Sequence, residues 1–245
     1  MSKIDNILDR TIRKFERRAK LSDSDREALL GLPYRMSTAE PGRYIVREGA
    51  ATDHSVLVVS GMAFRHKISL AGARQILSFH IPGDFVDLEG SLLKVADHNV
   101  QALTRCELAF VPTVALKKLF DAHPQVALAM WIDTLIDASI FREWILNVGR
   151  RDARERIAHI FCELARRFEA AGMGSTEGYE LPMTQEHLAD AAGLTAVHVN
   201  RTLRAMDRDG LINRQRRFIF IPDWERSRDV AGFSELYLHL DQVAA

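Results

Sequence analysis

The sequence predicts an α+β fold: an N-terminal antiparallel β-roll, then one long helix, then a C-terminal domain of helices with a small β-hairpin. Short β-type runs separated by glycine and proline turns occupy the region from Tyr34 to Val111. A helical repeat of three and four residues follows, from about 124 to 148. After that helix, a glycine separates two short amphipathic segments, and two further β-type runs follow them.

Residues 1–31 are expected to form two N-terminal helices. Ser22 offers a side-chain oxygen that can cap the second helix, which ends near Gly31. The first helix carries apolar residues at helical spacing, namely Ile4, Leu8, Ile12 and Phe15.

Residues 32–122 are expected to form the β-roll. Turn residues recur at Pro41–Gly42, Gly49, Gly61, Gly72 and Pro82–Gly83. Turns at that density over about eighty residues imply a compact antiparallel barrel or roll. The predicted β-type runs are Tyr44–Val46, Val56–Val59, Met62–Ile68, Ile76–Phe79, Val100–Thr104 and Leu108–Val111.

Residues 123–149 are predicted to form a dimerisation helix. A mainly apolar stripe with spacings of three and four follows one face, and a stripe this long is typical of a helix that packs against its own copy. We therefore expect a homodimer. An alternative is that Trp131 and Trp144 cover the roll for part of this face. The expected interface residues are Leu128, Trp131, Leu135, Arg142 and Ile145.

Residues 150–232 contain the most informative stretch, TQEHLADAAGLTAVHVNRTLRAMDRDGL (184–211). Gly193 allows a tight turn between two helices, and Thr195 can cap the second helix. An apolar stripe on that helix packs it against the first one; its members are Val199, Leu203 and Met206.

The outer face of the second helix is rich in hydrogen-bond donors that suit base edges and phosphates. Its members are His198, Asn200, Arg201, Arg204 and Arg208. The alternative is a plain helical hairpin with a solvated face, but the arginine content argues against it. We therefore predict a DNA-binding element of the winged helix-turn-helix kind.

The wing is predicted just after this helix pair. Residues 213–217 (NRQRR) are basic, and the apolar run Phe218–Ile221 follows them, which indicates a hairpin with a basic tip. Six arginines and two aspartates between Arg201 and Arg217 give this segment a net charge of +4. The whole chain has 33 basic and 33 acidic residues, so it has no bulk attraction to nucleic acid. A local basic patch on a neutral protein favours targeted phosphate contact.

Two cysteines, Cys106 and Cys162, are too few for a disulfide framework or a cysteine-ligated metal centre. We expect them to be buried free thiols in a reducing compartment. The N-terminus lacks the apolar core of a signal peptide, and the longest apolar stretch, 126–140, is interrupted by Asp133 and Asp137. A cytoplasmic protein with no membrane contact, no assigned metal and no assigned cofactor is therefore expected.

Four motifs, together with the order of the domains, carry a resemblance to a known family. They are GRYIVREG (42–49), PGDFVDLEG (82–90), GRRDARERIAHIF (149–161) and MTQEHLADAAGLTAVHVNRTL (183–203). The chain resembles the Crp/Fnr family of bacterial transcription regulators over about residues 25–230. This resemblance implies a cyclic-nucleotide-binding-like roll that senses a signal. It also implies a homodimer on double-stranded DNA with two-fold-related half-sites, and we expect RNA polymerase as a further partner.

The effector is left unidentified by the sequence. In family members that bind cyclic AMP, a glutamate holds the ribose and an Arg-Ser or Arg-Thr pair holds the phosphate. Leu88 falls at the glutamate's place, with Asp87 and Glu89 expected to point elsewhere, and His98–Asn99 replaces the pair. Because a histidine is largely neutral at cytosolic pH, cyclic AMP is not expected to bind.

The cysteines and histidines of the chain bear on two other signals that members of this family sense. Two separated cysteines cannot supply the four ligands of an iron–sulfur cluster. Haem sensing stays open, with a histidine of the roll as axial ligand; the candidates are His54, His66, His80 and His98.

The recognition helix also departs from the best-known members of the family. Val197 stands where they have a glutamate, and the arginine four residues later is Arg201. A valine can contact a thymine methyl group but cannot accept a hydrogen bond from cytosine, so we expect a different half-site. Arg201 is expected to contact a base. The full set of expected DNA contacts is Thr184, Gln185, Thr195, Val197, His198, Asn200, Arg201, Arg204, Arg216 and Arg217.

An enzyme is the alternative of a different class, because a small β-roll can be a metal-dependent cupin. That chemistry requires two histidines alternating on one strand, and no His-x-His occurs in the chain. A DNA-binding repressor that needs no effector shares every residue discussed here and stays open, as does the choice between activation and repression. Residues 233–245 are expected to form a C-terminal tail.

Overall fold

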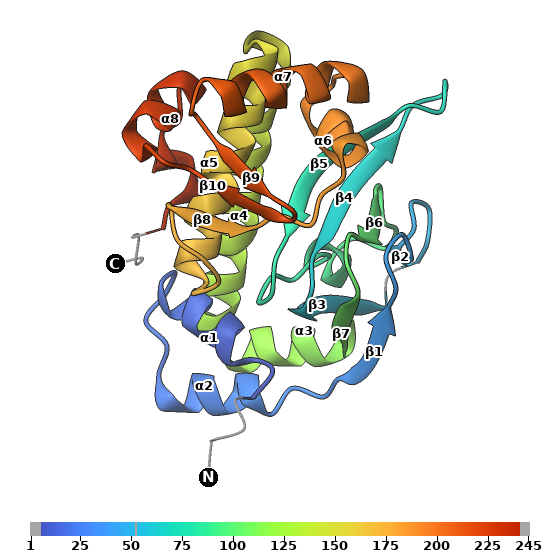
Figure 1. The fold of residues 1–245 in the computed structure, drawn as a ribbon. Coiled ribbons are helices and arrows are strands. Elements are labelled where there is room, and N and C mark those ends of the chain that lie inside the picture. The colour runs from blue at the N-terminus through green and yellow to red at the C-terminus, as the bar shows by residue number, and fades with distance from the viewer. Residues whose placement is uncertain (1–5, 52, 241–245) are drawn as a thin grey trace. The chain divides into compact units, whose positions relative to one another are not determined.

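The computed structural model describes residues 6–51 and 53–240 (Figure 1). It divides into two compact units. Within the described residues, the first unit comprises residues up to 66 together with 79–138. The second comprises 67–78 together with 139–240. Ile4, expected in the first helix, lies outside the described residues. In the part of the chain that is described, no helix is long and apolar enough to cross a membrane.

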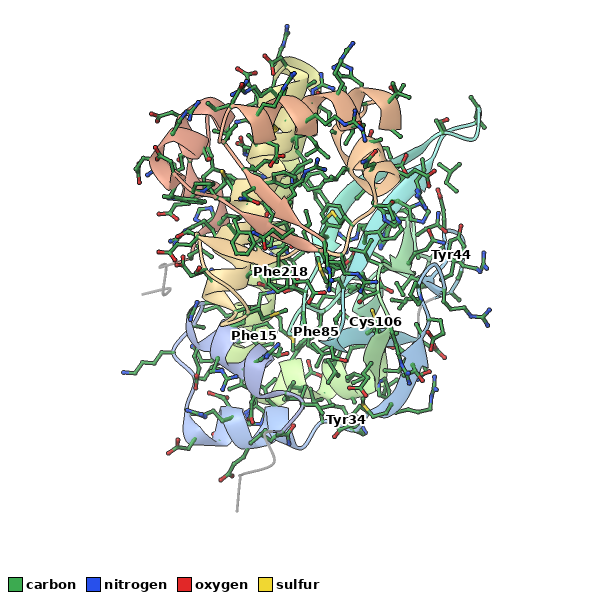
Figure 2. The ribbon with its side chains drawn as sticks, in the orientation of Figure 1. Phe15, Tyr34, Tyr44, Phe85, Cys106 and Phe218 are labelled. Atoms are coloured by element: carbon green, nitrogen blue, oxygen red, sulfur yellow. The ribbon has the colours of Figure 1, made fainter. Side chains whose placement is uncertain are left out.

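The two N-terminal helices form as predicted: α1 (Asp9–Glu16) and α2 (Asp23–Leu30). The Ser22 hydroxyl caps α2 by accepting a hydrogen bond from the backbone N–H of Asp25 at 3.2 Å, which satisfies one of the free donors of the first turn. On α1, Leu8, Ile12 and Phe15 are buried. The Phe15 ring stacks on Phe85 with centroids 6.5 Å apart, and Figure 2 labels both.

Lys14 of α1 joins two acidic residues that lie far from it in sequence. Its Nζ atom lies 2.9 Å from Asp84 Oδ1 and 2.7 Å from Asp133 Oδ2. Burial alone would lower the pKa of Lys14, but the carboxylates of Asp133 and Asp84 outweigh that effect and raise it. The amine is therefore charged at every physiological pH.

Among the described residues, the roll contains seven strands in two antiparallel sheets. One sheet has the order β1-β7-β3 and the other β2-β6-β4-β5. The strands are β1 (Arg35–Ala39), β2 (Tyr44–Val46), β3 (His54–Ser60), β4 (Ala63–Ile68), β5 (Arg74–His80), β6 (Asn99–Ala102) and β7 (Cys106–Pro112). A short 3-10 helix, η1 (Glu89–Ser91), interrupts the connection between β5 and β6.

The core of the roll is apolar and closely packed. Val58, Ala63, Val100 and Cys106 are each less than 1 % exposed and belong to one buried cluster. Gly61, between β3 and β4, has a φ of +82°, and a Cβ atom there would lie 2.2 Å from the carbonyl oxygen of Arg105. Only glycine fits at that turn.

Two helices follow the roll: α3 (Thr113–Ala122) and α4 (Pro124–Arg150). The long helix was predicted as 124–148 and extends two residues further. Val126, Ala129 and Met130 on one face of α4 are buried within the core of the first unit.

The C-terminal part begins with α5 (Ala153–Ala170), which Asp152 caps through the backbone N–H groups of Arg154 and Glu155. A three-stranded sheet with the order β8-β10-β9 accompanies four shorter helices. The elements are β8 (Gly178–Glu180), α6 (Gln185–Ala192), α7 (Ala196–Arg208), β9 (Asn213–Gln215), β10 (Phe218–Phe220), α8 (Trp224–Ala231) and η2 (Glu235–Leu238).

The start of the segment expected to be a tail is packed in place. Phe233 and Leu238 are buried, and the Tyr237 hydroxyl donates to Glu163 Oε2 at 2.9 Å. Trp144 of α4 donates its indole N–H to the same oxygen at 2.9 Å. The carboxylate of Glu163, on a residue only 1 % exposed, is thus satisfied by donors from two other segments.

Candidate nucleic-acid interface

The turn between α6 and α7 has the geometry expected for a helix-turn-helix. Gly193 adopts a left-handed conformation with φ of +64°, and Thr195 caps α7 by accepting from the His198 N–H at 3.2 Å. The stripe of α7 packs inward, since Val199, Leu203 and Met206 are at most 2 % exposed. These sequence predictions are confirmed by the structure.

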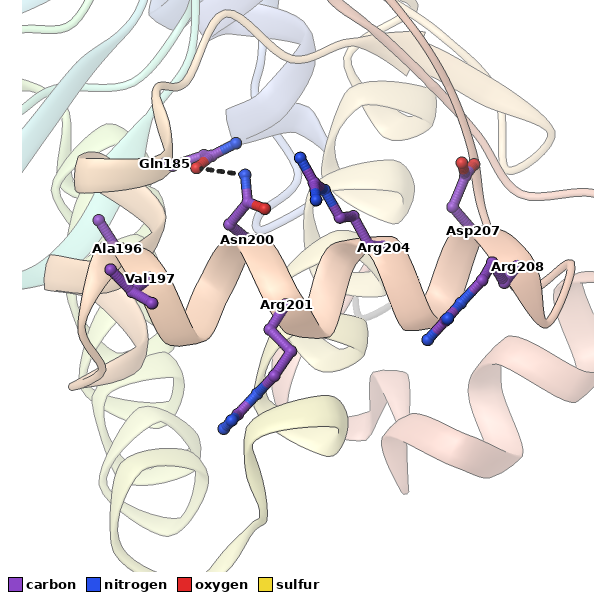
Figure 3. A pocket seen from close by; sticks show the side chains of 8 residues that line it. All are labelled: Gln185, Ala196, Val197, Asn200, Arg201, Arg204, Asp207 and Arg208. Atoms are coloured by element: carbon purple, nitrogen blue, oxygen red, sulfur yellow. Dashed lines mark hydrogen bonds between the residues drawn. The ribbon is translucent and has the colours of Figure 1, made fainter.

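The outward face of α7 borders an open groove (Figure 3). Arg201, Arg204 and Arg208 are exposed along it, and Val197 near the start of the helix is 82 % exposed. Figure 3 shows the Arg201 and Arg208 side chains leaving one side of the helix, and Asn200 and Arg204 another. The lining residues are Gln185, Ala196, Val197, Asn200, Arg201, Arg204, Asp207 and Arg208.

Several polar residues of the expected contact set hold the element together. The Thr184 hydroxyl caps α6 by accepting from the His187 N–H at 3.2 Å. The Asn200 side-chain amide donates to Gln185 Oε1 at 2.9 Å, so α6 and α7 are linked by their side chains. His198 is only partly exposed. Gln185 and Asn200 line the groove, but part of their hydrogen-bonding capacity is already used.

The wing places two arginines at its tip. Arg216 and Arg217 form the two-residue turn between β9 and β10, and both are exposed. Arg216 has a φ of +54°, a left-handed conformation that is costly for a residue with a side chain. Phe220 of β10 also pairs with Gly178 of β8, a strand that the sequence analysis did not predict.

Along α4, most residues of the predicted stripe are exposed in the described structure. Trp131 is 64 % exposed, Leu135 is 52 % exposed and Ile145 is 70 % exposed. Arg142 is also exposed, and Leu128 is partly buried. Of the two tryptophans in the alternative prediction, Trp131 is largely exposed, and Trp144 is buried and donates its indole N–H to Glu163 of α5.

The acidic residues around η1 lie close to one another. One ligating atom from each of Asp87 and Glu89 lies within 4.8 Å of the other and of a ring nitrogen of His98. They flank Leu88 at the start of a tight 3-10 turn rather than along a regular α-helix, which directs both carboxylates to one side. Leu88 itself is buried.

Arg65 of β4 is the cation of this region. Its Nη2 atom donates to the Val86 carbonyl at 2.8 Å and lies 3.0 Å from Glu89 Oε1. Burial, and then the charge of Glu89, raise the pKa of Asp87 to about 7. Burial, and then the charge of Arg65, lower the pKa of His98, so its imidazole is neutral at pH 7. Asn99 is engaged, because its side-chain oxygen accepts from the Glu48 N–H at 3.1 Å.

The other histidines proposed as haem ligands are spread over the strands. His54 begins β3 and its Nδ1 lies 2.5 Å from Asp53 Oδ1. His66 of β4 is buried with its ring centroid 5.4 Å from that of Phe64, and His80 is buried at the end of β5. The signal that sequence reasoning missed is the spacing Asp87-x-Glu89 together with the Asp97-His98 pair.

Comparisons with known proteins agree with this architecture. A family model for the cyclic nucleotide-binding domain matches residues 37–123, and one for the Crp-like helix-turn-helix domain matches residues 155–226. The transcriptional activator protein FnrL of Cereibacter sphaeroides is 30% identical over 197 residues, which cover 79% of each chain. The transcriptional activator protein anr of Pseudomonas aeruginosa is 26% identical over 203 residues, which cover 83% of each. The structure of FixK2 from Bradyrhizobium japonicum has a TM-score of 0.76 at 25% identity and covers 83% of this chain and 100% of its own.

Proposed function

Because the chain belongs to the Crp/Fnr family of transcription regulators, we propose that it works in the cytoplasm as a homodimer that reads a two-fold-related DNA site through α7. The observation that carries this proposal is the exposed arginine face of α7 along an open groove, and the tip of the wing is basic as well. The diameter of an α-helix such as α7 (13 residues) fits the width of a major groove, and the wing arginines suit phosphates. RNA polymerase would be the partner that turns DNA binding into regulation.

Within this interface the roles differ. Arg201 lies near the start of the recognition helix, where side chains reach base edges, and we assign it to base recognition. Val197 is exposed beside it and suits a thymine methyl group. Arg216 and Arg217 would contact phosphates. Thr184, Thr195 and Gln185 keep donors that can reach the backbone of the duplex, and His198, Asn200 and Arg204 would make the remaining contacts.

A binding-site selection tests these roles. Arg201→Ala is expected to relax the preference at one base pair per half-site and to cost ~1–3 kcal/mol there. Arg216→Ala is expected to weaken all sequences alike and to reduce the salt slope by roughly one unit per lost phosphate contact. Arg105→Ala, an exposed arginine of the roll, is the control for loss of charge alone. An unchanged consensus with Arg201→Ala, together with a reduced salt slope, would contradict the assignment.

We further propose that cyclic AMP is not the signal. Leu88 offers no acceptor for the ribose, and His98, with a neutral imidazole, offers no fixed cation for the phosphate. Arg65 is nearby, but its Nη2 atom already lies against Val86 and Glu89. Calorimetry with cyclic AMP should show no binding in the micromolar range. Micromolar binding that also raises DNA affinity would overturn this part of the proposal.

A further inference from the structure

Three side chains from neighbouring turns of the roll bring potential metal ligands together. Asp87 precedes η1, Glu89 is its first residue, and His98 precedes β6. One ligand atom from each lies within 4.8 Å of the other two. An imidazole with two carboxylates and no thiolate is a ligand set that divalent first-row transition metals accept.

His98 is held in the tautomer that a metal ligand needs. Its Nδ1 atom lies 2.8 Å from Asp97 Oδ1, so Nδ1 carries the proton and donates it to that carboxylate. Nε2 is then left with a free lone pair. This atom is buried, makes no hydrogen bond in the described structure and lies 3.8 Å from Glu89 Oε1. A carboxylate behind a histidine is the usual support of a metal-bound imidazole.

Asp87 supplies a second, independent sign of a missing partner. The residue is 2 % exposed, and its Oδ1 atom is buried without a hydrogen-bond partner among the described residues. Leaving a carboxylate oxygen unsatisfied in the interior is costly, and a bound cation would remove that cost. Two unsatisfied ligand atoms, from Asp87 and His98, therefore belong to the same cluster.

Arg65 is the competing cation and neutralises part of the cluster. Its guanidinium lies 3.0 Å from Glu89 Oε1, whereas the buried Oδ1 of Asp87 and Nε2 of His98 still make no hydrogen bond. The Glu89 side chain is 28% exposed and can move more freely than the other two. A metal ion would therefore have to draw Glu89 away from Arg65.

We propose that Asp87, Glu89 and His98 bind one divalent first-row transition metal ion inside the β-roll. Bonds of about 2.0–2.2 Å require the ligand atoms to approach more closely than they do here, and movement of Glu89 supplies most of that approach. Water would complete the coordination shell. This inference does not depend on the proposed DNA contacts.

Metal titration of the full-length protein, purified without a polyhistidine tag and stripped with a chelator, tests the proposal. Co²⁺ is followed by its visible absorption and Zn²⁺ by calorimetry. We expect one ion per chain, with affinity reduced about tenfold or more in His98→Gln and in Glu89→Gln. Circular dichroism and thermal melting check that each variant folds.

His54→Gln is the matched control, because Asp53-His54 repeats the Asp-His pair of Asp97-His98 but His54 does not belong to the three-residue cluster. Its affinity should equal that of the wild type. No saturable binding to the wild type would overturn the proposal, and so would equal losses in His54→Gln and His98→Gln. If His98→Gln fails to fold, the metal affinity of Glu89→Gln decides the question, because the Glu89 side chain is partly exposed and its replacement should not disturb folding. Wild-type metal affinity in Glu89→Gln would also overturn the proposal.

Discussion

The side-chain amide of Asn200 donates a hydrogen bond to the side-chain oxygen of Gln185, with 2.9 Å between the two atoms. This bond joins the recognition helix α7 to α6 on the same side as the groove. Both residues were expected to contact DNA. In the structure they also have a positioning role, because their hydrogen bond fixes the angle between α6 and α7.

Replacing both residues tests that positioning role. Asn200→Ala and Gln185→Ala should each destabilise the protein, and their effects should be non-additive by roughly 0.5–1.5 kcal/mol, because either change removes the same bond. A double-mutant cycle in urea measures this coupling. The cycle of Gln185→Ala with Arg204→Ala, a residue of the same groove, should be additive. Equal coupling in both cycles would show that the bond is unimportant in solution.

Leu135→Glu should separate the proposed dimer. The Leu135 side chain is 52 % exposed on the stripe of α4, so the substitution places two like charges in the seam. We expect the dissociation constant to rise about a hundredfold, corresponding to roughly 3 kcal/mol. Sedimentation velocity measures this change. Val114→Glu, an exposed aliphatic residue on α3, should leave the association unchanged, and an undiminished dimer with Leu135→Glu would contradict the proposed seam.

Arg216→Gly should separate stability from DNA affinity. Its φ of +54° favours glycine, so the change should raise the free energy of unfolding by about 1 kcal/mol while it removes a phosphate contact. Arg217→Gly removes the same charge, but Arg217 is not among the residues described with positive φ. It should therefore weaken DNA binding without stabilising the protein. Thermal unfolding and DNA titration on the same samples distinguish the two, and equal stabilities of the two variants would contradict the expectation.

Both cysteines should be unreactive in the folded protein. Burial raises the pKa of Cys106 to about 11 and that of Cys162 to about 12, so both remain protonated thiols at pH 8. A thiol reagent should label neither residue in buffer and both in guanidinium chloride. Because the unfolded thiols ionise first, these groups should lower the stability as pH rises above 9. Rapid labelling of the native protein would contradict this prediction, because it would show that at least one of the two cysteines becomes accessible to solvent.

The regular parts of the fold were predictable because their residues repeat with the period of the structure that they form. Val199, Leu203 and Met206 marked the inner face of α7, and Gly193 marked the turn before it. The strand β1 was missed because its residues, RMSTA, are mostly polar and exposed at the edge of a sheet. Strand β8 was missed because three residues are too few to show alternation.

The spacing Asp87-x-Glu89 and the pair Asp97-His98 are visible in the sequence, but the cluster that these residues form in the roll is not. Asp87 and Glu89 were expected to point away from the place of the family's glutamate, and a 3-10 turn begins between them. His98 joins them from the start of another strand, and only the tertiary fold brings these residues within ligand distance. The link between Asn200 and Gln185 was hidden for the same reason, since 15 positions separate the two residues in sequence.

The shared carboxylate of Glu163 has a consequence for the gene that encodes this chain. A stop codon in front of Phe233 would appear to delete a tail, yet it would also remove the Tyr237 hydroxyl from an acid in the middle of α5. Among the described residues, Trp144 and the more distant Arg167 would then remain as its partners. Residues 233–238 therefore contribute to the hydrophobic interior, and a nonsense mutation just before them should act as a folding mutation.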